Sequence, residues 1–212
     1  MTGPHHGWPV ERRGEPLATA KAAMILLHGR GATAHDILSL VDEIDTEGFA
    51  YLAPQAAGYT WYPYSFLAPI DQNEPGLSSA LQVISDLLAE IEAAGIPAER
   101  TMILGFSQGA CLTLEYTARH ARRYGGIVGL TGGLIGPQST SRDYPGLLDG
   151  TPILVASSDP DPHIPVARVK ETVIVLDGMG ATVEARLYPN MGHTINADEV
   201  AYVREMMANL VR

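Results

Sequence analysis

Short apolar runs alternate along this chain with segments whose apolar residues recur at helical spacing. Apolar runs bounded by glycine, proline or polar residues are typical of strands buried on both faces of a parallel sheet. Apolar residues three or four positions apart predict amphipathic helices that cover such a sheet. The strands are predicted at residues 22–27, 49–54, 101–104, 126–131, 153–156 and 183–188, the last by alternation. The helices are predicted at residues 37–44, 77–91, 110–116, 166–176 and 197–210.

This order of elements predicts the fold class. Strands that alternate with helices imply an α/β fold with a mainly parallel central sheet and helices on both faces. The 212 residues fit one domain, 1–212, that is long enough to bury a sizeable core. Residues 1–20 are an N-terminal extension, in which residues 10–16 and the turn signal Arg13-Gly14-Glu15 predict a β-hairpin into the next segment. Residues 55–100 leave room for one helix but not for a cap domain.

The segment Gly105-Phe106-Ser107-Gln108-Gly109 carries the most specific chemistry. It stands between a predicted strand and a predicted helix, which is the context of a nucleophile elbow. Ser107 would then lie on a sharp turn, with the N–H groups of the following helix aimed at charge that develops on a substrate. Because the chain has 22 glycines, the same pattern is also compatible with a plain glycine-rich turn. The interpretation therefore depends on the partners that a serine nucleophile needs.

A serine hydroxyl needs a histidine base, and the histidine needs an acid that orients it. Asp161 and His193 each follow a predicted strand, so both are expected at the sheet edge that carries Ser107. Their order along the chain, Ser, Asp, His, is that of the α/β-hydrolases. Asp159 is the competing acid. Asp161 is favoured because it lies farther along the loop, where the chain can reach back toward the histidine.

The loop after the first buried strand, His28-Gly29-Arg30-Gly31, supplies a further part of such a site. In an α/β-hydrolase, this loop gives one backbone N–H of the oxyanion hole and the residue after the nucleophile gives the other. We therefore expect the N–H groups of Arg30 and Gln108 to be the donors. A plain glycine loop that ends the strand is the alternative.

Residues 55–76 have no sustained periodicity but are rich in aromatic side chains. These are Tyr59, Trp61, Tyr62, Tyr64 and Phe66. A long aromatic loop in a compact domain predicts the wall of a binding site, with ordinary core packing of the rings as the alternative.

Charge and cysteine content narrow the function classes. The net charge of −10 disfavours nucleic acid or an anionic membrane as a partner. The single cysteine, Cys111, excludes an intramolecular disulfide and a structural zinc site, and we interpret it as a core residue rather than a second nucleophile. The absence of a visible signal peptide or bilayer-length apolar run predicts a cytoplasmic protein. His5 and His6 are interpreted as a solvated tail rather than as metal ligands.

The motifs together resemble the phospholipase/carboxylesterase family, which includes the acyl-protein thioesterases. They are His28-Gly29-x-Gly31, Gly105-Phe106-Ser107-Gln108-Gly109, Asp161-Pro162-x-x-Pro165 and Gly192-His193. The likeness extends from about Ala22 to the C-terminus. It implies an α/β-hydrolase fold without a cap, a triad of Ser107, Asp161 and His193, and an oxyanion hole formed by the N–H groups of Arg30 and Gln108. Neither a metal nor an organic cofactor is implied.

The sequence thus predicts a serine carboxylesterase that hydrolyses small to medium acyl esters through an acyl-enzyme. The polar segment 71–74, together with Arg30 and His163, departs from the thioesterase pattern and argues against a long-chain acyl-protein substrate. The expected substrate contacts are Trp61, Phe66, Leu134 and His163. An acyl thioesterase or a dienelactone-type lactone hydrolase is the enzymatic alternative, and a catalytically silent ligand-binding protein is the non-enzymatic one. The natural substrate and the oligomeric state, monomer or homodimer, stay open.

Overall fold

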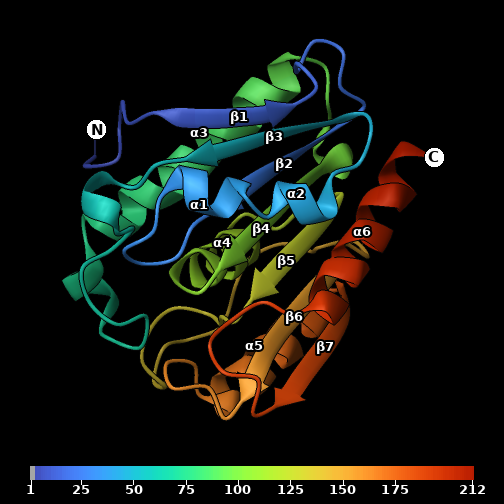
Figure 1. The fold of residues 1–212 in the computed structure, drawn as a ribbon. Coiled ribbons are helices and arrows are strands. Elements are labelled where there is room, and N and C mark those ends of the chain that lie inside the picture. The colour runs from blue at the N-terminus through green and yellow to red at the C-terminus, as the bar shows by residue number, and fades with distance from the viewer. Residues whose placement is uncertain (1–2) are drawn as a thin grey trace.

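The computed structural model describes residues 3–212 and contains a seven-stranded sheet (Figure 1). The strand order is β1-β3-β2-β4-β5-β6-β7, in which β1 is antiparallel to β3 and all other neighbours are parallel. The strands are β1 (Val10–Gly14), β2 (Ala22–Leu27), β3 (Phe49–Pro54), β4 (Thr101–Phe106), β5 (Gly126–Leu130), β6 (Pro152–Asp159) and β7 (Thr182–Pro189). The predicted α/β class with a mainly parallel sheet is confirmed.

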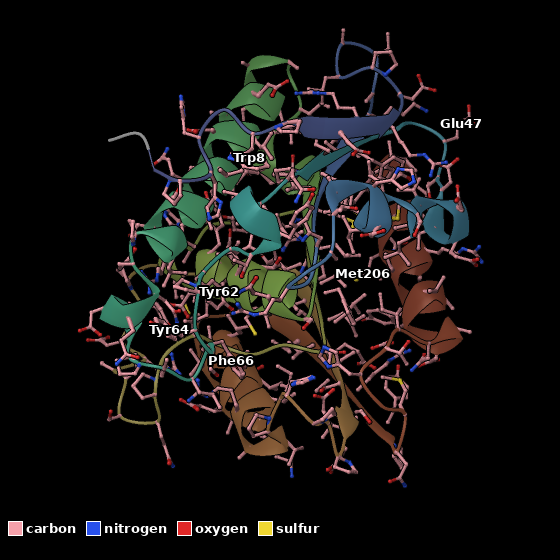
Figure 2. The ribbon with its side chains drawn as sticks, turned by 60° about the vertical axis from the view of Figure 1, so that its left-hand side comes forward. Trp8, Glu47, Tyr62, Tyr64, Phe66 and Met206 are labelled. Carbon is pink, nitrogen blue, oxygen red and sulfur yellow. The ribbon has the colours of Figure 1, made fainter. Side chains whose placement is uncertain are left out.

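Helices cover both faces of the sheet (Figure 1). One face carries α3 (Gly76–Ala93), α4 (Gln108–Arg119) and α5 (Val166–Gly178), and the other carries α1 (Ala34–Leu38), α2 (Val41–Ile44) and α6 (Ala197–Val211). Each set of helices buries its apolar side chains in a separate hydrophobic cluster. Figure 2 shows Tyr62 and Phe66 on the first face and Met206, from α6, on the second.

The central strands β2 and β4 are neighbours, and almost all of their residues are buried. From β2 the chain moves outward to β3 and then returns to β4 on the other side of β2. A crevice forms at such a switch point, beyond the carboxyl ends of the strands, because the two connections run in opposite directions. The loops that follow β2 and β4 therefore meet at the edge where α/β proteins carry their sites.

The prediction that the N-terminal extension forms a hairpin with the segment that follows it is wrong. Residues 10–14 do form a strand, but β1 pairs antiparallel with β3, with Val10 opposite Pro54 and Gly14 opposite Ala50. Both edges of β2 are occupied, one by β3 and one by β4, so β1 cannot pair with β2 and instead extends the sheet beside β3.

The helix predicted over residues 37–44 is divided into α1 and α2. The hydroxyl of Ser39 donates to the carbonyl of Asp36 over 2.7 Å, an arrangement in which a serine side chain competes with the backbone ladder of a helix. Ile37 and Ile44 are nevertheless both buried against the sheet, as their spacing predicts.

The connection from β3 to β4 contains α3 and three short 3₁₀ turns, Ala57–Tyr59, Ile70–Asn73 and Ala98–Arg100. No further helix or strand lies between β3 and β4, a stretch that the structure describes completely. Within residues 3–212, none of the helices combines the length and the apolar character that crossing a membrane requires.

Candidate active site

Ser107 lies on a tight turn between β4 and α4. Its φ is 54° and its ψ is −115°, a conformation that residues other than glycine rarely adopt. Its backbone N–H donates to the carbonyl of Leu130, at the end of β5, over 2.9 Å. A side chain at Gly105 would collide with the backbone of Gly109, and one at Gly109 would collide with that of Leu27. The two glycines therefore permit the turn, and the turn presents the hydroxyl at the edge of the sheet.

Ser107, His193 and Asp161 form a continuous hydrogen-bonded row. The Oγ of Ser107 lies 2.8 Å from Nε2 of His193, and Nδ1 of His193 lies 2.9 Å from Oδ2 of Asp161. Because an ionised carboxylate can only accept, Nδ1 carries the proton and Nε2 accepts from the serine hydroxyl. The Asp161 side chain is fully buried, while that of His193 is 20% exposed. The row thus runs from a protected carboxylate to an accessible hydroxyl.

Backbone donors hold the second carboxylate oxygen of Asp161. The N–H groups of His163 and Ile164 donate to its Oδ1 over 2.7 and 2.9 Å. Burial raises the pKa of Asp161, but the hydrogen bonds from His163, His193 and Ile164 outweigh it and hold the pKa below its usual value. Asp161 is therefore ionised at neutral pH, as an orienting acid must be. The competing Asp159 is exposed at the end of β6, and it is Asp161 that contacts the histidine.

The N–H groups of Arg30 and Gln108 belong to the loops after β2 and β4. Gln108 is the first residue of α4, so its N–H has no acceptor within the helix. Arg30 follows Gly29, whose carbonyl accepts from Nδ1 of His28 over 2.8 Å, while Nε2 of His28 accepts from the N–H of Ala56 over 3.1 Å. Burial lowers the pKa of His28, which keeps its ring neutral. His28 thereby fixes the peptide that carries the Arg30 N–H.

A cavity of about 500 Å³ opens over Ser107 and His193, a size typical of small-molecule sites. Its buried part is formed by Tyr62, Phe66, Cys111 and Ile164, and its exposed rim carries Arg30, Tyr64 and His163. The remaining lining residues are Gly29, Ala32, Pro63, Ser65, Phe106 and Gln108. Tyr62, Tyr64 and Phe66 follow one another along the loop between β3 and α3 (Figure 2). The aromatic loop therefore forms one wall of the cavity.

Comparison with known proteins identifies the family. The family model described as phospholipase/carboxylesterase matches residues 14–211. The chain belongs to this family. The crystal structure of a phospholipase/carboxylesterase from Dyadobacter fermentans is 49% identical in sequence, with a TM-score of 0.92, and the match covers 96% of this chain and 97% of that one.

Relatives with assigned names are more distant. Acyl-protein thioesterase 1 of Gibberella zeae is 26% identical over 210 residues, which are 88% of this chain and 89% of that protein. Carboxylesterase SOBER1 of Arabidopsis thaliana is 29% identical over 144 residues, 66% of this chain and 61% of that protein. The predicted resemblance is thus confirmed, and the chain is a serine hydrolase of a family that acts on carboxylic esters.

In this member of the family, the side chains of Arg30 and Gln108 hold the aromatic loop. The Arg30 guanidinium donates to three successive carbonyls, at residues 62–64, over 2.7 to 2.9 Å. Gln108 donates through Nε2 to the carbonyl of Tyr62 over 2.8 Å, and its Oε1 accepts from the N–H of Trp61 over 2.9 Å. The two residues whose N–H groups were predicted to bind an oxyanion therefore also fix the aromatic wall.

The predicted substrate contacts are divided between the cavity and the core. Phe66 and His163 line the cavity, but Trp61 and Leu134 are fully buried and lie outside its lining. The indole of Trp61 turns inward because its Nε1 donates to the carbonyl of His28 over 2.9 Å. Leu134 packs into the hydrophobic cluster beneath α3, α4 and α5. Trp61 and Leu134, which were predicted to contact the substrate, are therefore core residues that do not line the cavity.

Cys111 agrees with its prediction, whereas His5 does not. Cys111 is buried, as predicted, but it lines the cavity as well, and burial raises the pKa of its thiol to about 12, which keeps it protonated. His5, predicted in a solvated tail, is buried, and its ring bonds the carbonyl of Trp61 and the N–H of Ala57 over 2.9 and 3.0 Å. Across residues 3–212, no cluster of three histidine, cysteine or carboxylate side chains could hold a metal ion.

Proposed function

We propose that the chain is a carboxylesterase in which Ser107 is the nucleophile, His193 the general base and acid, and Asp161 the group that orients the imidazole. The observation that supports this most strongly is the hydrogen-bonded row of 2.8 and 2.9 Å from the serine hydroxyl to a buried carboxylate. Its three members come from three loops at one edge of the sheet. An ionised acid, a neutral base and an accessible hydroxyl in contact are what nucleophilic acyl transfer requires.

Acylation begins when Nε2 of His193 takes the proton of the Ser107 hydroxyl and Oγ attacks the ester carbonyl. Negative charge then develops on the former carbonyl oxygen. The N–H groups of Arg30 and Gln108 stabilise that charge because they are held in place before the reaction. When the tetrahedral intermediate collapses, Nε2–H of His193 gives its proton to the departing alkoxide, and the acyl group remains on Oγ.

Deacylation repeats these steps with water as the attacking group. His193 takes a proton from the water, which attacks the acyl carbonyl, and then returns the proton to Oγ of Ser107 as the acid product leaves. Asp161 keeps its negative charge throughout and stabilises the imidazolium that forms in each half of the reaction.

The dimensions of the cavity favour small to medium acyl groups. Tyr62, Phe66, Cys111 and Ile164 offer a short buried apolar surface, and the rim then becomes polar and exposed at Arg30. Each methylene that leaves water contributes about 0.8 kcal/mol only as long as apolar surface is there to receive it. Chain-length preference should therefore level off early.

An acyl thioesterase is the second candidate, because the Gibberella zeae relative carries that name and the same groups would attack a thioester. A series of p-nitrophenyl esters from acetyl to palmitoyl, measured beside matched thioesters, distinguishes the two. We expect kcat/KM to be highest between acetyl and hexanoyl esters, with Ser107→Ala lower in kcat by roughly 10⁶-fold. Rates that still rise toward palmitoyl thioesters would favour the thioesterase, and turnover by Ser107→Ala equal to wild type would refute both.

A further inference from the structure

A second, apolar groove of about 420 Å³ adjoins the candidate active site. Its apolar surface comes from Ile37 in α1, from Leu40 between α1 and α2, from Phe106 before Ser107 and from Ile195 after His193. Asp36 and Glu43 stand at its rim, and both are exposed. None of the catalytic steps described above uses this groove.

The groove adjoins the catalytic cavity at Gly29, Ala32 and Phe106, which line both. A Cβ atom at Gly29 would stand 3.3 Å from Cδ1 of Phe106 and 3.4 Å from Cβ of Ser107. Any longer side chain at this position would fill the junction. The missing side chain of Gly29 therefore leaves space beside Ser107 where the two cavities adjoin.

The side on which the groove lies determines which part of an ester can enter it. The ring of Phe106 lies 5.2 Å from the ring of His193, centroid to centroid, and Ile195 belongs to the same loop as His193. The atom that receives the proton from His193 is the oxygen of the leaving alcohol, so the alcohol must emerge beside this imidazole. The buried surface formed by Tyr62, Phe66 and Cys111 is left for the acyl chain.

We infer that the groove between Leu40, Phe106 and Ile195 is the binding site for the alcohol portion of the ester, and that it takes an uncharged, apolar alcohol of several carbons. The inference rests on the proposed function, because it takes His193 as the proton donor. The acidic rim at Asp36 and Glu43 opposes an anionic leaving group. The enzyme is thus selective for esters that carry apolar groups on both sides of the scissile bond.

The test fills the groove from its outer end while leaving the catalytic residues unchanged. Leu40→Trp and, independently, Ser39→Trp place a large ring in the groove. Leu187→Trp is the control, since Leu187 is 36% exposed on β7, outside both cavities. Each variant is compared with wild type on methyl butyrate, hexyl butyrate and methyl hexanoate after its melting temperature has been measured.

We expect wild type to prefer hexyl butyrate to methyl butyrate at least tenfold in kcat/KM. In both groove variants this preference should fall at least fivefold, while the ratio for methyl hexanoate over methyl butyrate stays within twofold of wild type. The Leu187→Trp control should leave both ratios unchanged. If wild type hydrolyses the esters but neither groove variant alters the alcohol preference, the inference is wrong. If the groove variants instead lower the ratio for methyl hexanoate over methyl butyrate, the groove takes the acyl chain. A wild type that hydrolyses none of the three esters would refute the proposed function itself.

Discussion

The loops after β2 and after β7 are built alike but use their histidines differently. Each follows a parallel strand at the same sheet edge, contains one histidine and ends in a helix with a capping box, Thr33–Asp36 in one and Asn196–Glu199 in the other. His28 is fully buried, with both ring nitrogens bonded to backbone groups. His193 is partly exposed, with one nitrogen on a carboxylate and the other on a serine hydroxyl.

The difference shows that the role of a histidine at the end of a strand depends on the hydrogen-bond partners of its ring as well as on its position. A ring whose nitrogens are both occupied by backbone groups holds a loop in shape, and its proton cannot move without breaking that shape. A ring held by a carboxylate at Nδ1 has Nε2 available for chemistry. In the proposed mechanism, His28 and His193 therefore serve one reaction in two ways: His28 orients a backbone N–H and His193 transfers a proton.

The largest expected effect comes from His193→Ala. Removing the base leaves Ser107 with no acceptor for its proton, and kcat on a p-nitrophenyl ester should fall roughly 10⁶-fold, as for other serine hydrolases that lose this residue. The melting temperature should change little, since the ring is partly exposed. A kcat within tenfold of wild type would mean that the two histidines do not differ as described.

The next effect separates the two acids near His193. Asp161→Asn should keep the geometry but stabilise the wrong tautomer of the imidazole, with a loss of about 10⁴ in kcat by the precedent of other triads. Asp159→Asn is the matched control, because Asp159 lies in the same loop and is exposed, and it should cost less than tenfold. The reverse ranking, measured at pH 7, would transfer the orienting role to Asp159.

Substitutions of His28 test the positioning role. His28→Asn can still donate to the Gly29 carbonyl, whereas His28→Gln places its amide nearer to the Ala56 N–H. Because a missing oxyanion donor costs about 10² to 10³ in kcat, a misdirected Arg30 N–H should cost roughly 10- to 100-fold in His28→Gln. His28→Asn should lose less than tenfold. Equal losses in both variants, or losses that merely follow their melting temperatures, would argue against this role.

The smallest expected effect is a difference between the two capping boxes in how their acidic residues change stability with pH. Hydrogen bonds from the Thr33 side chain and backbone lower the pKa of Asp36, while burial raises the pKa of Glu199 to about 7. Ionised Asp36 therefore stabilises the fold above its unfolded pKa, and this contribution disappears as the pH falls through the lower, folded value. The contribution of buried Glu199 to the free energy of unfolding has the opposite sign. Glu199 ionises more readily in the unfolded chain than in the folded one, so the fold is progressively destabilised as the pH rises from the unfolded pKa toward 7.

Melting temperatures between pH 4 and pH 8 measure both contributions. Relative to wild type, Glu199→Gln should gain stability as the pH rises, by a few degrees at pH 8, since about 1 kcal/mol corresponds to roughly 2–4 °C at this chain length. Asp36→Asn should be less stable than wild type at pH 7, with a smaller difference because Asp36 is exposed. Parallel curves for Glu199→Gln and wild type would contradict the raised pKa.

Much of the candidate site could be predicted because its determinants are local. The elbow is encoded by two glycines around Ser107, and the partners lie in loops that follow recognisable strands. Asn196 and Glu199 likewise have the three-residue spacing that is typical of a capping box, which the structure contains. Parallel strands bring such loops to one edge, so the order of elements was enough to bring distant residues together.

Features that depend on packing between distant segments could not be predicted. The apolar residues of the aromatic loop show no periodicity. The sequence therefore does not indicate that Trp61 turns toward the carbonyl of His28 while Tyr62 faces the cavity. The groove arises because Leu40 and Ile195 come together only in the folded chain. The strand character of residues 10–14 was visible, but its partner depended on which sheet edge remained free.

The most direct measurement is covalent labelling of the nucleophile. Wild-type protein is treated with a fluorophosphonate probe, and the adduct is located by intact-mass and peptide mass spectrometry, beside Ser107→Ala and Asp161→Asn. The proposed mechanism predicts one adduct per chain on Ser107, none on Ser107→Ala, and much slower labelling of Asp161→Asn because its histidine is held in the wrong tautomer. An adduct on another residue, or wild-type protein that stays unlabelled while hydrolysing esters, would contradict the assignment of Ser107.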